Sequence, residues 1–183
     1  MVAKMTNYII TFLLALCFLS TSCSSDKYSK QICQIDSLMK VLDSVNLKLN
    51  SLDTSVVQSY YKEYSKNIKL IKENFKEKND EEVWSVITRY GLLRKPLRDF
   101  KDHYIYYSKE ISFSRKQLVN LKADIKNNIL TEDKILKYLK DEAEYVKYYN
   151  LSVSGLMENT QNYYNQYLEL NPKVEKFLSK NKI

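Results

Sequence analysis

The sequence predicts an all-α fold, an elongated antiparallel three-helix bundle with coiled-coil-like packing and a short C-terminal helix. Its 183 residues include only two glycines and two prolines, so the residues that usually form turns are scarce. Along most of the chain, apolar side chains recur at alternating steps of three and four residues, the period of a coiled-coil seam. Only three or four residues separate the periodic stretches, and such short connections place consecutive helices side by side in antiparallel directions.

The first periodic stretch covers residues 32–78, and its period slips by one residue near the middle. One seam ends at Val56 and the next begins at Val57. Asp53 and the two hydroxyl residues after it could each cap a new helix. We expect one long helix that bends here, with two separate helices as the alternative. The two seams are Ile35, Leu38, Leu42, Val45, Leu49, Leu52 and Val56, then Val57, Tyr61, Tyr64, Ile68, Ile71 and Phe75.

The second stretch follows Asn79, a good N-cap residue, with Glu82 at the capping-box position. One helix over residues 81–127 would be about 70 Å long. Pro96 lacks a backbone N–H and Gly91 is close by, so we expect a kink or break between these two residues. The seam is Tyr90, Leu93, Leu97, Phe100, Tyr104, Tyr107, Ile111, Ser114, Leu118, Leu121 and Ile125.

The third stretch begins after Asn127 and Asn128, which end the second helix, and Thr131 caps its start. Asn171 and Pro172 resemble a helix stop followed by a new start. We therefore expect a separate short helix over 173–179. The seam of the third stretch is Ile135, Leu139, Glu142, Val146, Tyr149, Val153, Leu156, Thr160, Tyr163, Tyr167 and Leu170.

Folding the two hairpins places many of the 16 tyrosines level with other seam residues. One such layer contains Tyr61, Tyr64, Leu93, Leu97, Tyr163 and Tyr167, and Tyr107 lies level with 149–153. A tyrosine-lined groove for a ligand is one interpretation. We prefer ordinary core packing, with hydroxyls that reach water, because a stripe at helical spacing usually packs in a core.

Glu142 is a carboxylate on an otherwise apolar part of its seam, level with Ser114 and Arg115. We expect a Glu142–Arg115 ion pair between helices, which would fix their register as polar seam residues do in coiled coils. A catalytic acid is the alternative. No second carboxylate, histidine or nucleophile is expected nearby to support it.

The N-terminus predicts an exported protein. Lys4 precedes an apolar run over 8–19, and small residues follow it. That order is typical of a signal peptide, here residues 1–22. The apolar run is shorter than the ~20 residues that span a bilayer, so a transmembrane anchor is the less favoured alternative.

Leu19-Ser20-Thr21-Ser22-Cys23 resembles the lipobox of bacterial lipoproteins, in which the cysteine is acylated and becomes the mature N-terminus. Ser20 stands where that pattern usually has leucine, which leaves ordinary signal cleavage as the alternative. The resemblance implies lipidation of Cys23, with palmitate among the acyl groups. Residues 23–31 are polar and would form a flexible tether, and 32–183 would form a single helical domain.

Few chemistries remain open to such a chain. Cys17 would leave with the signal peptide and Cys23 would be lipidated, so Cys33 remains as the one free thiol. It could join two chains, but we expect a partly buried, inert cysteine. His103 is the only histidine, which excludes a histidine-based zinc or di-iron site within one chain. No glycine-rich phosphate loop is present. We expect no cofactor, no metal and no catalysis.

The net charge is +7, but lysines and acids are interleaved along the chain. Lysines alternate with aromatic residues at 137–140 and 147–149, a pattern found in single-strand nucleic-acid binding. Export makes that partner improbable, and we expect none.

The preferred interpretation is a lipid-anchored envelope protein that acts as a structural spacer or protein-interaction module. The alternative is a binding protein, such as an inhibitor, an immunity-type partner or an adhesin, that uses an exposed tyrosine-rich face. The body resembles small helical lipoproteins of bacterial envelopes in architecture. We expect the outer membrane rather than the inner, and oligomers could form through coiled-coil faces or Cys33.

Overall fold

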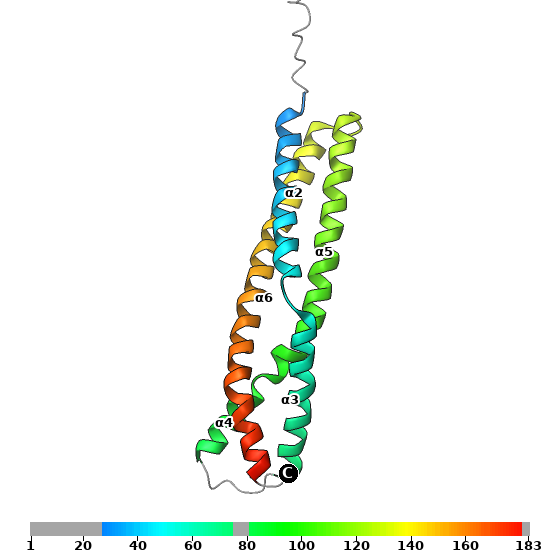
Figure 1. The fold of residues 1–183 in the computed structure, drawn as a ribbon. Coiled ribbons are helices and arrows are strands. Elements are labelled where there is room, and N and C mark those ends of the chain that lie inside the picture. Colours follow the sequence, from blue (N-terminus) through cyan, green and yellow to red (C-terminus); the bar gives the residue numbers. More distant parts are fainter. Residues whose placement is uncertain (1–26, 75–80, 181–183) are drawn as a thin grey trace, which may run out of the picture.

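The computed structural model describes residues 27–74 and 81–180, and within these ranges all regular structure is helical (Figure 1). The predicted all-α class and the helical bundle are therefore confirmed. The helices are α2 (Ser29–Asn50), α3 (Thr54–Asn74), α4 (Glu81–Gly91), α5 (Arg94–Lys126) and α6 (Glu132–Lys180). No helix of these two ranges combines the length and the apolar character that crossing a bilayer requires.

The helices form an elongated body with two halves. In the proximal half, α2, α5 and the start of α6 pack against one another, and in the distal half α3 and α4 pack against the end of α6. The start of α2 and the α5–α6 connection lie at the same end, whereas the C-terminal end of α6 lies at the opposite end (Figure 1). Because α6 runs the whole length, it links the two halves.

The chain enters the bundle earlier than the sequence predicts. The predicted helical domain starts at residue 32, but α2 begins at Ser29 and the ring of Tyr28 is already buried. Tyr28 packs in the apolar core of the proximal half, which explains the early start. The predicted signal peptide and the first part of the predicted tether, residues 1–26, lie outside the described residues.

The first stretch is two helices, so the preferred single bent helix is wrong and the alternative is confirmed. Asp53 ends the connection between α2 and α3, and its Oδ1 accepts hydrogen bonds from the backbone N–H groups of Ser55, at 2.9 Å, and Val56, at 3.2 Å. The hydroxyl of Ser55 also donates to this carboxylate, and these bonds hold the pKa of Asp53 below its usual value. This N-cap stabilises a new helix at the place where the seam slips.

A second break separates α4 from α5 at Leu92 and Leu93, as the sequence predicts for the interval between Gly91 and Pro96. Pro96 lies in the first turn of α5, where a missing backbone N–H leaves no intrahelical hydrogen bond unmade. The predicted capping residue Asn79 lies outside the described residues.

The connection between α5 and α6 is also as predicted. Asn128 adopts a left-handed backbone conformation with φ of 53°. The N–H of Ile129 then donates to the carbonyl of Asp124 at 3.0 Å, which closes the end of α5. The helix that follows starts at Glu132, and the carbonyl of Thr131 accepts its first bond from Ile135.

The predicted separate C-terminal helix is wrong, because α6 continues through Pro172 to Lys180. Leu170 precedes the proline, and Val174 and Leu178 follow it. The three residues keep a regular spacing of four residues across the proline, and all three are buried. Their burial in the distal core keeps the segment helical despite the missing N–H. Asn171, the expected stop, is buried as well.

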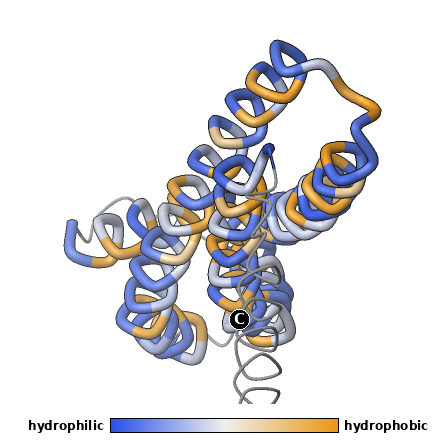
Figure 2. Tube along the Cα trace, turned by 90° about the horizontal axis from the view of Figure 1, so that it is seen from above, coloured by the Kyte–Doolittle hydropathy of each residue, from blue (hydrophilic) through white to orange (hydrophobic). Residues whose placement is uncertain are grey.

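The predicted seams form the core. Nearly every seam residue of the described ranges is buried or half-buried, in two apolar clusters that correspond to the two halves. Leu52, Tyr104 and Leu156 pack against both clusters and join them. Figure 2, viewed from above the bundle, shows hydrophobic positions recurring between hydrophilic ones around each helix.

Candidate functional site

The distal half contains a cluster of tyrosine rings, as the sequence predicts, with Tyr64 and Tyr167 among the expected members and Tyr60 and Tyr90 as additional ones. Tyr167 of α6 stacks on Tyr60 of α3, with ring centroids 4.2 Å apart and an angle of 18° between planes. Tyr90 of α4 lies 5.0 Å from Tyr64 and 6.3 Å from Tyr167. Of the other expected members, Tyr61 stacks on Tyr64, and Tyr163 packs against the apolar core of this half. We call Tyr60, Tyr64, Tyr90 and Tyr167 the distal tyrosine cluster.

A buried polar network lies beside these rings. The hydroxyl of Tyr90 donates to Oδ1 of Asn171 at 2.6 Å, and Nδ2 of Asn67 donates to the same oxygen at 3.1 Å. All three side chains are buried, with Tyr90 fully so. The network therefore connects α3, α4 and α6 through one acceptor atom.

The polar network continues to two acids at the surface. Tyr167 donates a hydrogen bond from its hydroxyl to Oε2 of Glu63, and this bond lowers the pKa of Glu63. Glu175 lies against Glu63, and a hydrogen bond between the two carboxyl groups raises the pKa of Glu175. As the pH falls, Glu175 is therefore protonated before Glu63.

The phenols of this cluster are neutral at physiological pH. Burial raises the pKa of Tyr90 and of Tyr167, and a hydrogen bond with Tyr164 is the main reason why the pKa of Tyr60 rises to about 12. A phenol that stays protonated is a hydrogen-bond donor rather than a base or nucleophile.

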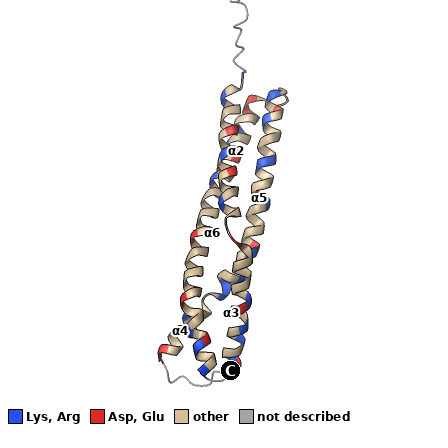
Figure 3. Ribbon diagram, in the orientation of Figure 1, with Lys and Arg blue, Asp and Glu red and all other residues tan. Residues whose placement is uncertain are grey.

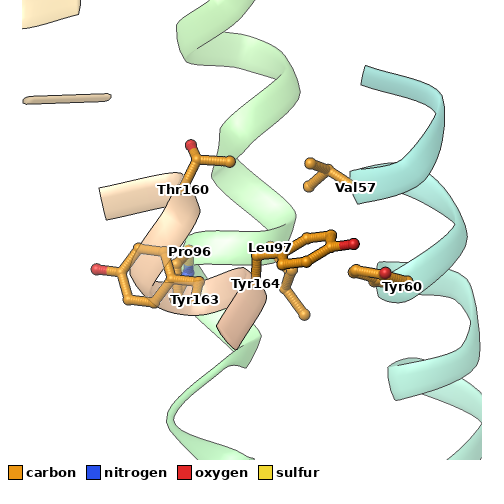
Figure 4. A pocket seen from close by; sticks show the side chains of 7 residues that line it. All are labelled: Val57, Tyr60, Pro96, Leu97, Thr160, Tyr163 and Tyr164. Carbon is orange, nitrogen blue, oxygen red and sulfur yellow. The ribbon is translucent and has the colours of Figure 1, made fainter. Parts of the chain in front are cut away.

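A cavity beside Tyr60 is too small for a substrate. It has a volume of about 20 Å³, enough for one water molecule, and lies among side chains from α3, α5 and α6 that Figure 4 shows. The rings of Tyr60, Tyr90 and Tyr167 therefore pack in the core, as predicted, beside a polar network that joins three helices. Tyr64 also lines a larger groove on the outer side of α3.

Glu142 is buried in the proximal core, but the predicted Glu142–Arg115 ion pair is wrong. The hydroxyl of Ser114 donates to Oε2 of Glu142 at 2.8 Å, whereas Nη1 of Arg115 lies 3.5 Å from Oδ1 of Asp43. Ser114 holds the seam position, and the next residue on a helix points about 100° away from it. Arg115 therefore faces α2 instead of α6. Burial raises the pKa of Glu142.

The other residues considered for chemistry are dispersed. Cys33 near the start of α2 is exposed, so the expectation that it would be partly buried is wrong. His103 is exposed on α5. Within residues 27–74 and 81–180, no group of three or more histidine, cysteine and acidic side chains could hold a metal ion. Cys23 lies outside the described residues.

Exposed aromatic residues gather on the proximal half, where α5 and α6 run side by side. Tyr106, Tyr145 and Tyr148 are exposed by 46%, 53% and 49%. Two further tyrosines, Tyr107 and Tyr149, contact these rings. The ring centroids of Tyr106 and Tyr107 are 5.2 Å apart, and those of Tyr148 and Tyr149 are 5.6 Å apart. We call these five residues the α5/α6 tyrosine face.

A hydrogen bond fixes this face across the two helices. The hydroxyl of Tyr149 on α6 donates to Oε2 of Glu110 on α5 at 3.0 Å. Phe113, which is also exposed, follows Glu110 by one helical turn and extends the aromatic surface along α5. The face is thus built on two packed helices rather than on a loop.

No known protein family matches this chain, and neither a curated protein nor a solved structure matches it. Its function therefore has to be argued from its own surface.

Neither Asn67 nor the α5/α6 tyrosine face was predicted from the sequence as a specific site. Asn67 lies three residues after Tyr64 and four before Ile71, which is seam spacing, so its burial could have been predicted. Tyr145 and Tyr148 lie off the seam, which was a signal for exposure. Figure 3 shows basic and acidic residues intermixed along the helices, in agreement with the interleaved charge of the sequence.

Proposed function

We propose that this protein is a lipid-anchored, non-catalytic protein of a bacterial envelope that acts as a spacer and protein-interaction module. The α5/α6 tyrosine face is its binding surface. The observation that carries this proposal is the exposure of Tyr106, Tyr145 and Tyr148 together on a face built by two packed helices.

We also propose the finer architecture of the bundle: three antiparallel columns in coiled-coil-like packing, of which α2 with α3 forms the first, α4 with α5 the second and α6 the third. The alternating spacing of the buried residues supports it.

Tyrosine suits a protein-binding surface for a physical reason. Its ring supplies a large, rigid apolar area with little conformational entropy to lose, and its hydroxyl bonds to polar groups of the partner. Burial raises the pKa of Tyr106 and Tyr107, so these phenols stay neutral donors at physiological pH. We therefore expect a protein partner that presents carbonyl or carboxylate acceptors around an apolar centre.

The position of the face agrees with an anchor at Cys23. The five residues from Cys23 to the buried Tyr28 can span at most ~18 Å. Tyr145 follows the start of α6 by thirteen residues, about 20 Å along the helix at 1.5 Å per residue. An anchored bundle would thus hold the tyrosine face tens of ångströms from the bilayer surface, within reach of a partner in the envelope.

Acylation is tested by metabolic labelling with a palmitate analogue in a bacterial host. We expect the wild-type chain to incorporate the label and to sediment with membranes. The Cys23→Ala variant should lose both properties, whereas Cys33→Ala should keep them. Labelling that survives in Cys23→Ala, or that fails in the wild type, would show that Cys23 is not the anchor.

The binding surface is tested by affinity capture from envelope extracts. We expect the Tyr145→Ser/Tyr148→Ser variant to retain less than about a tenth of the partner that the wild type captures, because tyrosine is enriched among the few interface residues that contribute about 2 kcal/mol or more each. Leu168→Ser is a matched control, because Leu168 is equally exposed but lies in the distal half. Equal capture by both variants, or no partner for the wild type, would refute the assignment of this face.

A further inference from the structure

A groove of about 350 Å³ lies along the outer side of α3, opposite the first residue of α5. This volume is within the range of small-molecule sites. Six of the side chains that line it are Tyr61, Tyr64, Ile68, Lys69, Lys72 and Arg94. The groove belongs to the distal half, so it is separate from the α5/α6 tyrosine face.

One wall of the groove is flat and apolar. The rings of Tyr61 and Tyr64 are nearly parallel, with 14° between their planes and 6.5 Å between centroids. Ile68 continues this wall one turn further along α3. Tyr64 is held in place because it is buried and its hydroxyl donates to the carbonyl of Gly91 at 3.3 Å. The wall is thus positioned before any ligand arrives.

The rim of the groove is positively charged. The ammonium of Lys69 lies 3.9 Å from the carboxylate of Glu73, so these two charges offset each other. Lys72 and Arg94 also line the groove, and neither forms an ion pair with another residue in the described parts of the chain. Arg94 approaches the Tyr64 hydroxyl closely enough to oppose the rise that burial causes in the pKa of Tyr64. Two cations therefore line the groove without an ion-pair partner among the described residues.

We propose that this groove binds a small organic anion with a flat apolar part, such as an aromatic carboxylate, sulfonate or phosphate monoester. The anionic group pairs with the Arg94 guanidinium, whose planar fork matches two oxygens of such a group, and with the Lys72 ammonium. The flat part packs against Tyr61 and Ile68 and removes apolar surface from water. The groove adds a small-molecule site to the protein-interaction role proposed above and does not depend on it.

Calorimetric titration of the purified full chain with naphthalene-2-sulfonate tests this proposal. We expect a dissociation constant below about 1 mM, a reasonable affinity for a ligand of this size. The neutral naphthalene-2-sulfonamide and inorganic sulfate should each bind at least tenfold more weakly, because each lacks one half of the recognised chemistry. Binding of the sulfonamide as tightly as the sulfonate would overturn the proposal, and so would no binding of the sulfonate.

Variants locate the site. Lys72→Gln/Arg94→Gln should weaken sulfonate binding at least tenfold. Arg98→Gln, on the same helix one turn further on, should leave it unchanged, because Arg98 is engaged by Asp99 at 2.7 Å. Since all substituted residues are exposed, unchanged helical circular dichroism checks the fold. The Tyr145→Ser/Tyr148→Ser variant should bind the sulfonate like the wild type. Unchanged binding in the Lys72/Arg94 variant, or lost binding in the Tyr145/Tyr148 variant, would overturn the assignment to this groove.

Discussion

Replacing Tyr90 with alanine should lower the free energy of unfolding by about 3–5 kcal/mol, the usual cost of truncating a fully buried aromatic ring. Tyr90 has 0% of its surface exposed and lies between the rings of Tyr64 and Tyr167. Alanine at this position leaves a cavity in the middle of the distal core. It also removes one of the two hydrogen-bond donors to the buried side-chain oxygen Oδ1 of Asn171.

The Tyr90→Phe variant separates the ring from the hydroxyl. It keeps the packing and removes only the hydrogen bond to Asn171, whose oxygen still accepts from Asn67. We expect a loss of about 1 kcal/mol, typical of one buried hydrogen bond. Urea unfolding followed by circular dichroism at 222 nm measures both losses, with the exposed Tyr145→Ala as the control. A loss of less than about 1 kcal/mol for Tyr90→Ala would contradict the central packing role of this ring.

Tyr90→Ala should destabilise the distal half more than the proximal half. The two apolar clusters are joined by few side chains, among them Leu52, Tyr104 and Leu156. Hydrogen exchange of Tyr90→Ala should therefore accelerate most in α3, α4 and the last turns of α6. Equal acceleration in α2 would mean that the halves unfold as one unit.

The spacing of apolar residues predicts most of the buried positions of this fold. Ile111, Leu118 and Ile125 were expected on one seam, and all three are buried. Periodicity succeeds because burial depends on which helix face meets the neighbours, and the sequence records that face directly. The helix break at Asp53 depends on a single capping side chain rather than on the spacing of apolar residues. Two helices were therefore the less favoured alternative.

Pairings between helices were harder to predict than burial. Ser114 and Arg115 are adjacent in sequence, yet Ser114 contacts Glu142 on α6 and Arg115 contacts Asp43 on α2. Which of the two meets Glu142 depends on the rotation of α5 about its axis, which only the packed structure determines. Asn171 was misread for a related reason. Its neighbour Pro172 suggested a helix end, whereas burial of the surrounding residues keeps the helix intact.

Replacing Glu142 with glutamine should make the protein more stable at pH 7. Glu142 is only 7% exposed, and its carboxylate has one hydrogen bond, from Ser114, and no ion pair with any residue of the two described ranges. A buried charge without a counter-charge costs free energy, and a neutral amide of the same shape avoids that cost. We expect a gain of about 1–2 kcal/mol, which raises the melting temperature of a chain of this size by roughly 2–8 °C.

The gain should depend on pH in a defined direction. Because burial raises the pKa of Glu142 in the folded protein above its unfolded value, the wild type gains stability from proton uptake at low pH. That contribution is fully present below the unfolded pKa of about 4.3 and is lost as the pH rises through the folded pKa. The advantage of Glu142→Gln should therefore be largest at pH 7 and should shrink toward pH 4.

Thermal unfolding of four proteins over pH 4–8 measures this effect: the wild type, Glu142→Gln, Ser114→Ala and the double variant. Ser114→Ala should destabilise the wild type most at neutral pH, because it removes the one hydrogen bond that favours the ionised carboxylate. In the Glu142→Gln background, Ser114→Ala should lower the free energy of unfolding by less, and this loss should depend little on pH. If Glu142→Gln is less stable than the wild type at pH 7, the ionised carboxylate stabilises the folded protein. Glu142 would then fix the register of α5 against α6 through its charge.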